Sequence, residues 1–403
     1  MNFPLRIFAG FAFAYFISAL LRAITATLAP TFSAELGLTA ADLGLLAGAY
    51  FLGFAATQLP LGRALDRFGP RRVLLSLLGV AVIGCAAFAL AGDFVALTVA
   101  RGLIGVGVSA CLMAPLTAFR RSFEPVAQLR ANSWMLMSGS FGMVAATLPV
   151  QWLLPVLGWR GVFWLICTLL VVAAALILRA VPRDESSGAT AAAPDGYAAI
   201  WRDATFRRLM PMGFFHYGGM VAIQSLWAGP WLVQVCGWSP TEAAAGLFGI
   251  NLSMLLAFLG WGVVVPRLYS SGWSAMRLIR WCAPASLLGL VAIAALGPRA
   301  TAPAWAIFCV CCSVVSLSQP ALGQAFPAQL AGRALSAFNL VIFAGVFGLQ
   351  WGLGLAIDSM AAAGMTTVSA YRGAMALFAL CILLSYLWFL WHGRREVAGQ
   401  AAA

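Results

Sequence analysis

The stretch "GRALDRFGPRR" (residues 62–72) separates two long apolar segments in the first quarter of the chain. It combines glycines, a proline and several charges, a composition typical of a tight surface turn. The flanking segments, which we place at 44–62 and 73–92, each have about the twenty apolar residues that a helix needs to cross roughly 30 Å of hydrocarbon. A turn of this kind between two such segments predicts a helical hairpin that crosses a membrane twice.

Composition extends this prediction to the whole chain. Of its 403 residues, 63% are hydrophobic and 9% are charged, whereas soluble domains carry roughly 25% charged residues. The sequence therefore predicts an all-α membrane protein with the lipid bilayer as its surroundings. We expect twelve membrane-spanning helices, at 6–30, 44–62, 73–92, 94–118, 131–156, 161–180, 209–229, 243–265, 276–297, 302–325, 334–357 and 370–392.

Arginines predict the orientation of these helices. All 24 basic residues are arginine, and with a cytoplasmic N-terminus only Arg160, Arg299 and Arg372 face outside, two lie within spans, and the other 19 lie on the cytoplasmic side. This asymmetry obeys the positive-inside rule. We expect a multi-pass protein of a bacterial-type inner membrane with both termini cytoplasmic. The arginines are dispersed over short loops, which argues against a nucleic-acid partner.

One long polar segment divides the chain into halves. Residues 181–208 carry proline, glycine, serine and charges between the sixth and seventh spans. We therefore predict an N-terminal six-helix bundle (1–180), a cytoplasmic central loop (181–208) and a C-terminal six-helix bundle (209–403). Transporters built from such repeats hold their solute near the bilayer midplane, between the bundles.

The opening stretch also resembles the cytoplasmic loop signature of the major facilitator superfamily (MFS). Glycines permit a close turn, and Asp66 can accept hydrogen bonds from helix N-terminal amides or from arginines. The resemblance implies a conformational latch that holds the two bundles in the outward-open state; the alternative is a basic loop that serves only topology. The residues that carry the resemblance are Gly62, Asp66, Arg67, Gly69, Arg71 and Arg72.

Two further stretches are similar to this family. In "RGLIGVGVSA" (101–110), Arg101 precedes small residues, as in the fourth-helix motif often associated with proton coupling, and "GWRGVFW" (158–164) enters the sixth span. "SGSFGMVAATLPV" (138–150) lacks the Gly-Pro pair of the family's drug antiporters, which disfavours drug–proton antiport. The resemblance implies alternating access by a monomer, without covalent chemistry or a resident cofactor, so we expect no enzyme.

Arg22 is the strongest candidate for the solute site, because a charge inside a span is costly and usually functional. It lies about sixteen residues beyond Arg6, hence roughly 24 Å along the helix and past the midplane toward the outside. Tyr15, Ser18 and Thr25 share its face and form a polar stripe. Arg22 either meets an anionic or strongly hydrogen-bonding solute, or it snorkels to the outer interface or binds backbone carbonyls.

All twelve acidic residues fall in loops or at helix ends. A buried carboxylate is the commonest proton carrier in such transporters. Its absence from the spans argues against organic cations as cargo and favours facilitated diffusion or anion exchange.

A second candidate site follows from "MPMGFFHYGGMVAIQ" (210–224), in which four-residue spacing places Met212, His216, Met220 and Gln224 along one helix face. Cys309 and Cys312, in "CVCCSVVSLSQ" (309–319), share a face of the tenth span. Sulfur and imidazole ligands suit Cu(I), and the His216–Met220 spacing resembles the superfamily's copper importers. Copper import is one hypothesis; apolar packing of these residues, or a proton carried by His216, are others.

The more ordinary hypothesis is a small organic solute, anionic or neutral-polar, bound by Arg22, His216, Gln224 and Asn251. Trp227 and Trp231 either stack on that solute or anchor their helix at the membrane interface, the interpretation we favour. A transporter fold can also act as a membrane sensor that binds its ligand without moving it.

Overall fold

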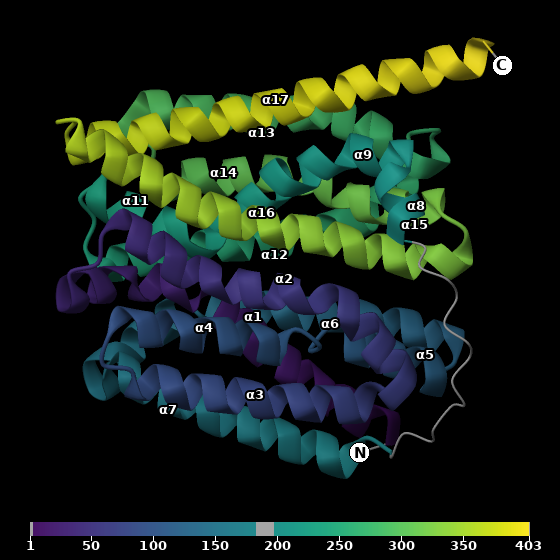
Figure 1. Cartoon of the computed structure of the whole chain (residues 1–403), viewed down its shortest axis with the longest axis horizontal. Coiled ribbons are helices and arrows are strands. Elements are labelled where there is room, and N and C mark those ends of the chain that lie inside the picture. Colours follow the sequence, from purple (N-terminus) through teal and green to yellow (C-terminus); the bar gives the residue numbers. More distant parts are fainter. Residues whose placement is uncertain (1–2, 183–196, 403) are drawn as a thin grey trace.

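The computed structural model describes residues 3–182 and 197–402, which are helical apart from short connections (Figure 1). The first seven helices pack against one another in one half of the molecule. They are α1 (Phe3–Leu36), α2 (Ala40–Phe68), α3 (Pro70–Leu90), α4 (Phe94–Val108), α5 (Met113–Ser122), α6 (Pro125–Ala145) and α7 (Leu148–Ala180).

The second half of the chain forms the other bundle. It contains α8 (Tyr197–Arg202), α9 (Ala204–Pro211), the π-helix η1 (Met212–Tyr217), α10 (Gly218–Ala222), the π-helix η2 (Ile223–Trp227), α11 (Ala228–Gln234), α12 (Pro240–Ser270), α13 (Ala275–Leu296), the 3₁₀ turn η3 (Gly297–Arg299), α14 (Ala302–Cys312), the 3₁₀ segment η4 (Ser313–Leu317), α15 (Ser318–Ala325), α16 (Ala328–Ala362) and α17 (Thr367–Ala402).

Ten helices of the described chain are long and apolar enough to span a membrane. The other two predicted spans do not correspond to one helix each. The predicted span 131–156 is divided between α6 and the start of α7, and the span 209–229 is interrupted by η1 and η2. The all-α membrane fold is confirmed. Within the predicted central loop, residues 183–196 lie outside the described residues, and most of 197–208 is helical in α8 and α9.

The hairpin at 62–72 is tighter than predicted. Helix α2 continues to Phe68 and α3 begins at Pro70, so Gly69 alone makes the turn, with φ +80°. Only glycine adopts such a conformation readily. The predicted turn role of Gly62 is wrong, because Gly62 lies inside α2, and a Cβ there would meet open space.

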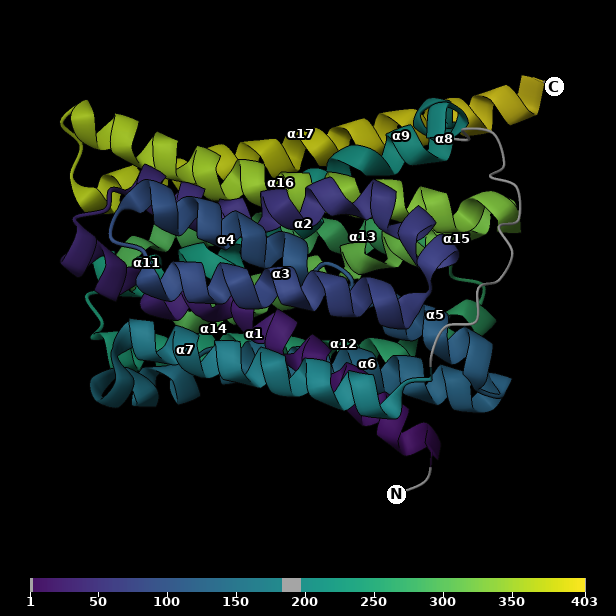
Figure 2. The same cartoon turned by 60° about the horizontal axis from the view of Figure 1, so that its bottom comes forward.

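Two ends of the molecule can be defined from the connections. At the linker end, α7 stops at Ala180 and α8 starts at Tyr197; at the far end, α1 stops at Leu36 and α2 starts at Ala40. Helices α2 and α16 run side by side along the seam between the bundles (Figures 1 and 2). This seam positions the candidate site.

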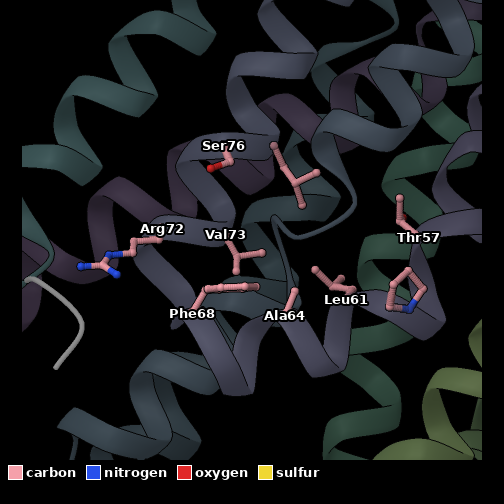
Figure 3. A pocket seen from close by; sticks show the side chains of 9 residues that line it. Thr57, Leu61, Ala64, Phe68, Arg72, Val73 and Ser76 are labelled. Carbon is pink, nitrogen blue, oxygen red and sulfur yellow. The ribbon is translucent and has the colours of Figure 1, made fainter. Parts of the chain in front are cut away.

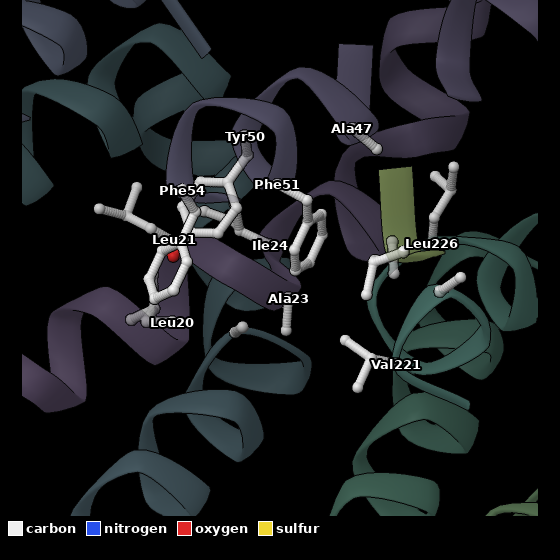
Figure 4. Packing of buried hydrophobic residues seen from close by; sticks show 14 of the residues in the cluster. Leu20, Leu21, Ala23, Ile24, Ala47, Tyr50, Phe51, Phe54, Val221 and Leu226 are labelled. Atoms are coloured by element: carbon white, nitrogen blue, oxygen red, sulfur yellow. The ribbon is translucent and has the colours of Figure 1, made fainter. Parts of the chain in front are cut away.

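An apolar layer fills the seam near its middle. Figure 4 shows Phe51 of α2 and Ala23 of α1 on one side, facing Val221 and Leu226 of the other bundle. Phe51 and Leu226 are almost fully buried. The two bundles are therefore joined here by side-chain packing rather than by polar contacts.

Candidate functional site

Arg22 lies close to the middle of α1. The sequence predicts a position past the midplane toward the outside, and Arg22 lies just beyond the middle of α1, which runs from Phe3 to Leu36 and extends six residues beyond the expected end at residue 30. This longer helix moves its midpoint toward Arg22. The Arg22 guanidinium carbon lies 5.6 Å from the ring centre of Phe54 in α2 and 5.7 Å from that of Phe343 in α16. One ring from each bundle therefore flanks the cation.

The guanidinium of Arg22 has aromatic and phenolic neighbours. Tyr15, Tyr50 and Tyr217 all lie close enough to interact with its charge. The side chain is partly exposed, yet Nε is buried and has no hydrogen-bond partner in the described chain. At least one donor of this cation is therefore not used by a described residue.

No described carboxylate balances this charge. The acidic residues that the structure describes lie near helix ends or in connections, and the groups that act on Arg22 are phenols. An ion pair that the structure does show joins Arg160 to Glu35 at 2.8 Å, at the far end. Arg22 therefore lies at the seam as a cation without a carboxylate partner among these residues.

Arg101 of α4 holds the segment of α1 that carries Arg22. It is 1% exposed, and its Nη2 donates to the carbonyl oxygen of Leu21 at 2.7 Å and to Oγ1 of Thr25 at 2.6 Å. Its guanidinium carbon lies 5.1 Å from the ring centre of Tyr50, whose hydroxyl donates to the Ser18 carbonyl at 3.1 Å. These contacts fix the backbone on both sides of Arg22.

The predicted polar stripe on α1 divides between two roles. Thr25 binds Arg101, and Ser18 donates to the Val108 carbonyl at 3.5 Å, so both face α4. Tyr15 is 7% exposed and packs its ring against Gly139 of α6, where a Cβ would overlap the ring. Of the stripe, Arg22 and Tyr15 lie near the seam, whereas Ser18 and Thr25 join α1 to α4.

His216 lies inside the second bundle, fully buried. Its Nδ1 is 3.0 Å from Oγ of Ser385 in α17, and that hydroxyl lies 2.8 Å from the Ile382 carbonyl, to which it donates. We therefore assign the ring proton to Nδ1, from the hydrogen-bond network. Nε2 is buried without a partner among the described residues.

Two π-helices, η1 and η2, interrupt the segment that carries the expected ladder around His216. The Ser385 hydroxyl contacts two of its members, at 3.0 Å from His216 Nδ1 and 3.9 Å from the Met212 sulfur. Met212 packs in an apolar cluster with Phe338, whereas Met220 belongs to a different cluster. Cys312 donates to the backbone carbonyl of His216 at 3.3 Å, and Cys309 is buried.

Gln224 and Asn251, both predicted to bind solute, meet each other. Gln224 Nε2 donates to Asn251 Oδ1 at 3.4 Å, and Asn251 Nδ2 donates to the Leu247 carbonyl at 3.0 Å. Both side chains are buried, at 4% and 3% exposure. The structure places this pair between η2 and α12.

The preferred role of the two tryptophans as interfacial anchors is wrong. Trp227 and Trp231 are both 0% exposed. Trp227 donates to the Gln350 carbonyl at 3.2 Å and Trp231 to the Ala300 carbonyl at 2.9 Å. Their indoles are packed inside the protein because each N–H finds a backbone acceptor there.

The latch residues gather at the linker end. Asp66 is exposed and makes no hydrogen bond or ion pair with a described residue, while Arg71 donates to the Leu178 carbonyl of α7 at 2.7 Å. Beside them, α2 and α3 form an apolar groove of about 440 Å³ with Arg72 at its edge (Figure 3). The groove lies on the α2–α3 hairpin and does not include Arg22.

Four residues near Arg22 were not predicted: Tyr50, Phe54, Tyr217 and Phe343. Three of them are aromatic residues in apolar runs with no polar neighbour to mark them. Tyr217 directly follows His216, but only the η1 geometry directs it toward the seam. Long-range proximity of this kind leaves no local sequence signal.

The fold defines the class of protein: a multi-pass membrane transporter built from two helical bundles. Residues 11–348 match the family model described as Major Facilitator Superfamily, and the chain belongs to this superfamily. It is thus a secondary transporter and not an enzyme. Among solved structures, a bacterial homologue of the human lysosomal transporter Spinster superposes with a TM-score of 0.78 and 15% identity, with 98% of each chain covered, a likeness of fold.

Curated relatives are more distant and partial. The chain is 32% identical over 114 residues to a probable sulfoacetate transporter of Cupriavidus necator, covering 28% of this chain and 26% of that one. It is 28% identical to a chloramphenicol resistance protein of Streptomyces lividans, covering 69% of each. It is 24% identical to the 3-(3-hydroxy-phenyl)propionate transporter of Escherichia coli K12, covering 56% of each. None of these names supports copper transport.

Proposed function

We propose that the protein carries a small organic anion across the membrane and that Arg22 binds the anionic group. The observation that carries this proposal is a partly exposed arginine at the seam between the bundles, with no described carboxylate to balance it. A charge that is even partly removed from water is costly unless it is paired. An anionic solute would provide the missing partner whenever it binds.

The surroundings of Arg22 fit an organic anion. Guanidinium groups bind carboxylate through charge-assisted hydrogen bonds, often two in parallel. The rings of Phe54 and Phe343 lie over the cation and leave its edge donors to the solute, while the phenols of Tyr15 and Tyr217 can donate to further oxygens. Two of the relatives, those of sulfoacetate and of 3-(3-hydroxy-phenyl)propionate, are named for anionic solutes.

The orientation belongs to the same proposal. The arginine asymmetry favours a cytoplasmic linker end, because the cytoplasmic side of membrane proteins is the more basic. Arg160 and Arg372 lie at the opposite, far end, where Arg372 donates to the Ala294 carbonyl at 2.7 Å.

The test is solute uptake into proteoliposomes that contain the purified protein in their membrane. The probes are radiolabelled sulfoacetate and 3-(3-hydroxyphenyl)propionate, and the variants are Arg22→Ala, Arg22→Lys and the control Arg299→Ala, which removes an exposed arginine at the far end. We expect Arg22→Ala to lower anion uptake at least about a hundredfold, the order seen when a charged partner is lost, and Arg22→Lys to retain part of it. Uptake by Arg22→Ala equal to that of Arg299→Ala would exclude Arg22 from the site.

A further inference from the structure

Helices α2 and α16 are in close contact from their middles to the far end. The ring centres of Phe54 and Phe343 are 4.5 Å apart. Further toward the far end, Gly48 faces Phe347, and a Cβ at Gly44 would overlap the carbonyl oxygen of Gln350. The backbones approach closely here because glycine leaves room.

Nearer the linker end, residues of α16 contact helices of their own bundle. Asn339 accepts from Gln319 of α15 at 3.1 Å, and Phe338 lies against Phe206 of α9 with ring centres 6.2 Å apart. These two residues of α16 therefore contact helices of their own bundle. The pair α2–α16 is closed at the far end.

Asp358, near the end of α16, completes this closure. Its Oδ1 accepts from the backbone N–H of Ala40 at 3.1 Å, and its Oδ2 accepts from that of Ala41 at 2.8 Å. Both amides belong to the first turn of α2. One carboxylate of one bundle therefore caps a helix of the other.

The first turn of α2 shows why this bond matters. The first four N–H groups of a helix have no acceptor within it. Within its own chain segment, Asp42 N donates to Thr39 Oγ1 at 3.2 Å and Leu43 N donates to the Thr39 carbonyl at 3.1 Å. The amides of Ala40 and Ala41 remain, and Asp358 takes both. Its charge also meets the positive end of the helix dipole.

We propose that Asp358 is a latch that holds the far end of the transporter closed. The two bundles cannot separate at the far end without breaking both hydrogen bonds. The two backbone amides and the Asp358 carboxylate would then have to be hydrated instead. Asp358 thereby shifts the conformational equilibrium toward the state that is closed at the far end and away from the state that is open there. The proposal rests on the transporter function, but not on the identity of the solute.

Asp66 lies at the other end of the same helix pair. It is exposed and unbound in this structure, while Asp358 is bound. Asp358, with its two partners, and Asp66, without a partner among the described residues, therefore lie at opposite ends of the same helix pair.

Hydrogen–deuterium exchange tests the latch without any solute. In the purified full-length protein, the amides of Ala40 and Ala41 are protected only through Asp358. Asp358→Asn should speed exchange in a peptide covering residues 38–44 about tenfold or more. The substitution replaces a charged acceptor by a neutral one, and hydrogen bonds to charged groups are the stronger ones. Asp93→Asn is the matched control: Asp93 accepts from Ala96 N at 2.8 Å and caps α4 within its own bundle. It should leave residues 38–44 unchanged.

A second pair of variants tests the same closure by changing helix packing without changing any charge. A Cβ at Gly354 would overlap the carbonyl oxygen of Ala40, whereas a Cβ at Gly352 meets nothing within 4 Å. Gly354→Ala should therefore part the helices and speed the same exchange, and Gly352→Ala should not. Unchanged exchange in Asp358→Asn, or equal acceleration in all four variants, would overturn the latch. Absence of anion uptake by the wild type would count against the proposed function. It would not affect the exchange result for Asp358.

Discussion

Arg22 combines a high cost of burial with an incomplete set of partners. Two aromatic faces within 6 Å offset part of that cost, by about 0.5–2 kcal/mol each. They attract the positive charge but accept no conventional hydrogen bond from its edge. Phe54 and Phe343 belong to different bundles, so relative movement of the bundles changes the surroundings of the cation. Binding at Arg22 and the state of the seam are therefore coupled.

At the residue scale, Asp66→Asn should give a folded protein whose uptake rate falls at least about tenfold, because an amide loses the charge that a helix N-terminus or arginine would bind. Uptake of the anion into proteoliposomes measures this effect. Glu124→Gln is the control, because Glu124 is an exposed acid that makes no capping bond at the start of α6. Normal uptake by Asp66→Asn would contradict the latch role predicted from the sequence.

Sequence identified Arg22 and Arg101 because a charge in an apolar segment stands out. It could not identify Tyr217 or Phe343, since their proximity to Arg22 depends on how two bundles meet. The same limit applies to Asp358. Its position near a predicted helix end was visible, but its bond to Ala40, 318 residues away along the chain, was not.

At the element scale, the segment α9–α11 shows what spacing alone leaves open. Two π-helices, η1 and η2, interrupt it. Met212 packs in one apolar cluster and Met220 in another. These packing partners favour an apolar role for the two methionines, which the spacing could not decide.

Copper accumulation should accordingly be the same in cells that express the wild type, Met220→Ala or an empty vector at low external copper. Elemental analysis of the cells at matched expression levels provides the measurement. Higher copper in the wild type alone, lost in the variant, would restore the metal path and contradict the packing role of Met220.

Glycines set the distance between α2 and α4. A Cβ at Gly105 would overlap the Tyr50 carbonyl oxygen, whereas a Cβ at Gly79 of α3 meets open space. Gly105→Ala should lower stability by about 1–3 kcal/mol through overpacking, and Gly79→Ala should raise it by about 0.5–1 kcal/mol through helix propensity. Thermal melting in detergent compares the two. Equal melting temperatures would show that α2 and α4 do not pack as closely as described.

Element boundaries followed from sequence where hydrophobicity changes sharply, as at α3 and α13. They failed where helices continue into polar sequence, as α2 does through Asp66 and α1 through Glu35. The predicted interfacial role of Trp227 and Trp231 was wrong for a different reason. Interfacial tryptophan is a statistical tendency, and here buried carbonyl acceptors outweigh it.

At the scale of the whole molecule, the structure is closed across the far end of α2–α16. Arg22 lies near the middle of α1, and Asp66, at the linker end, has no partner among the described residues. The two-bundle architecture was predictable because twelve apolar segments and one polar interruption leave few alternatives. The solute was not, because superfamily membership determines the transport cycle and not the chemistry of the cargo. The unpaired charge of Arg22 is what narrows that chemistry.

The central claim is tested most directly by equilibrium binding of a charged solute and its neutral counterpart to the purified wild type. Titration calorimetry should compare 3-(3-hydroxyphenyl)propionate with 3-(3-hydroxyphenyl)propionamide, which has the same ring and chain but no negative charge. If Arg22 binds an anionic group, the carboxylate should bind at least about tenfold more tightly, a difference of roughly 1.4 kcal/mol. Equal affinity for the two compounds, or tighter binding of the amide, would contradict an anion site at Arg22.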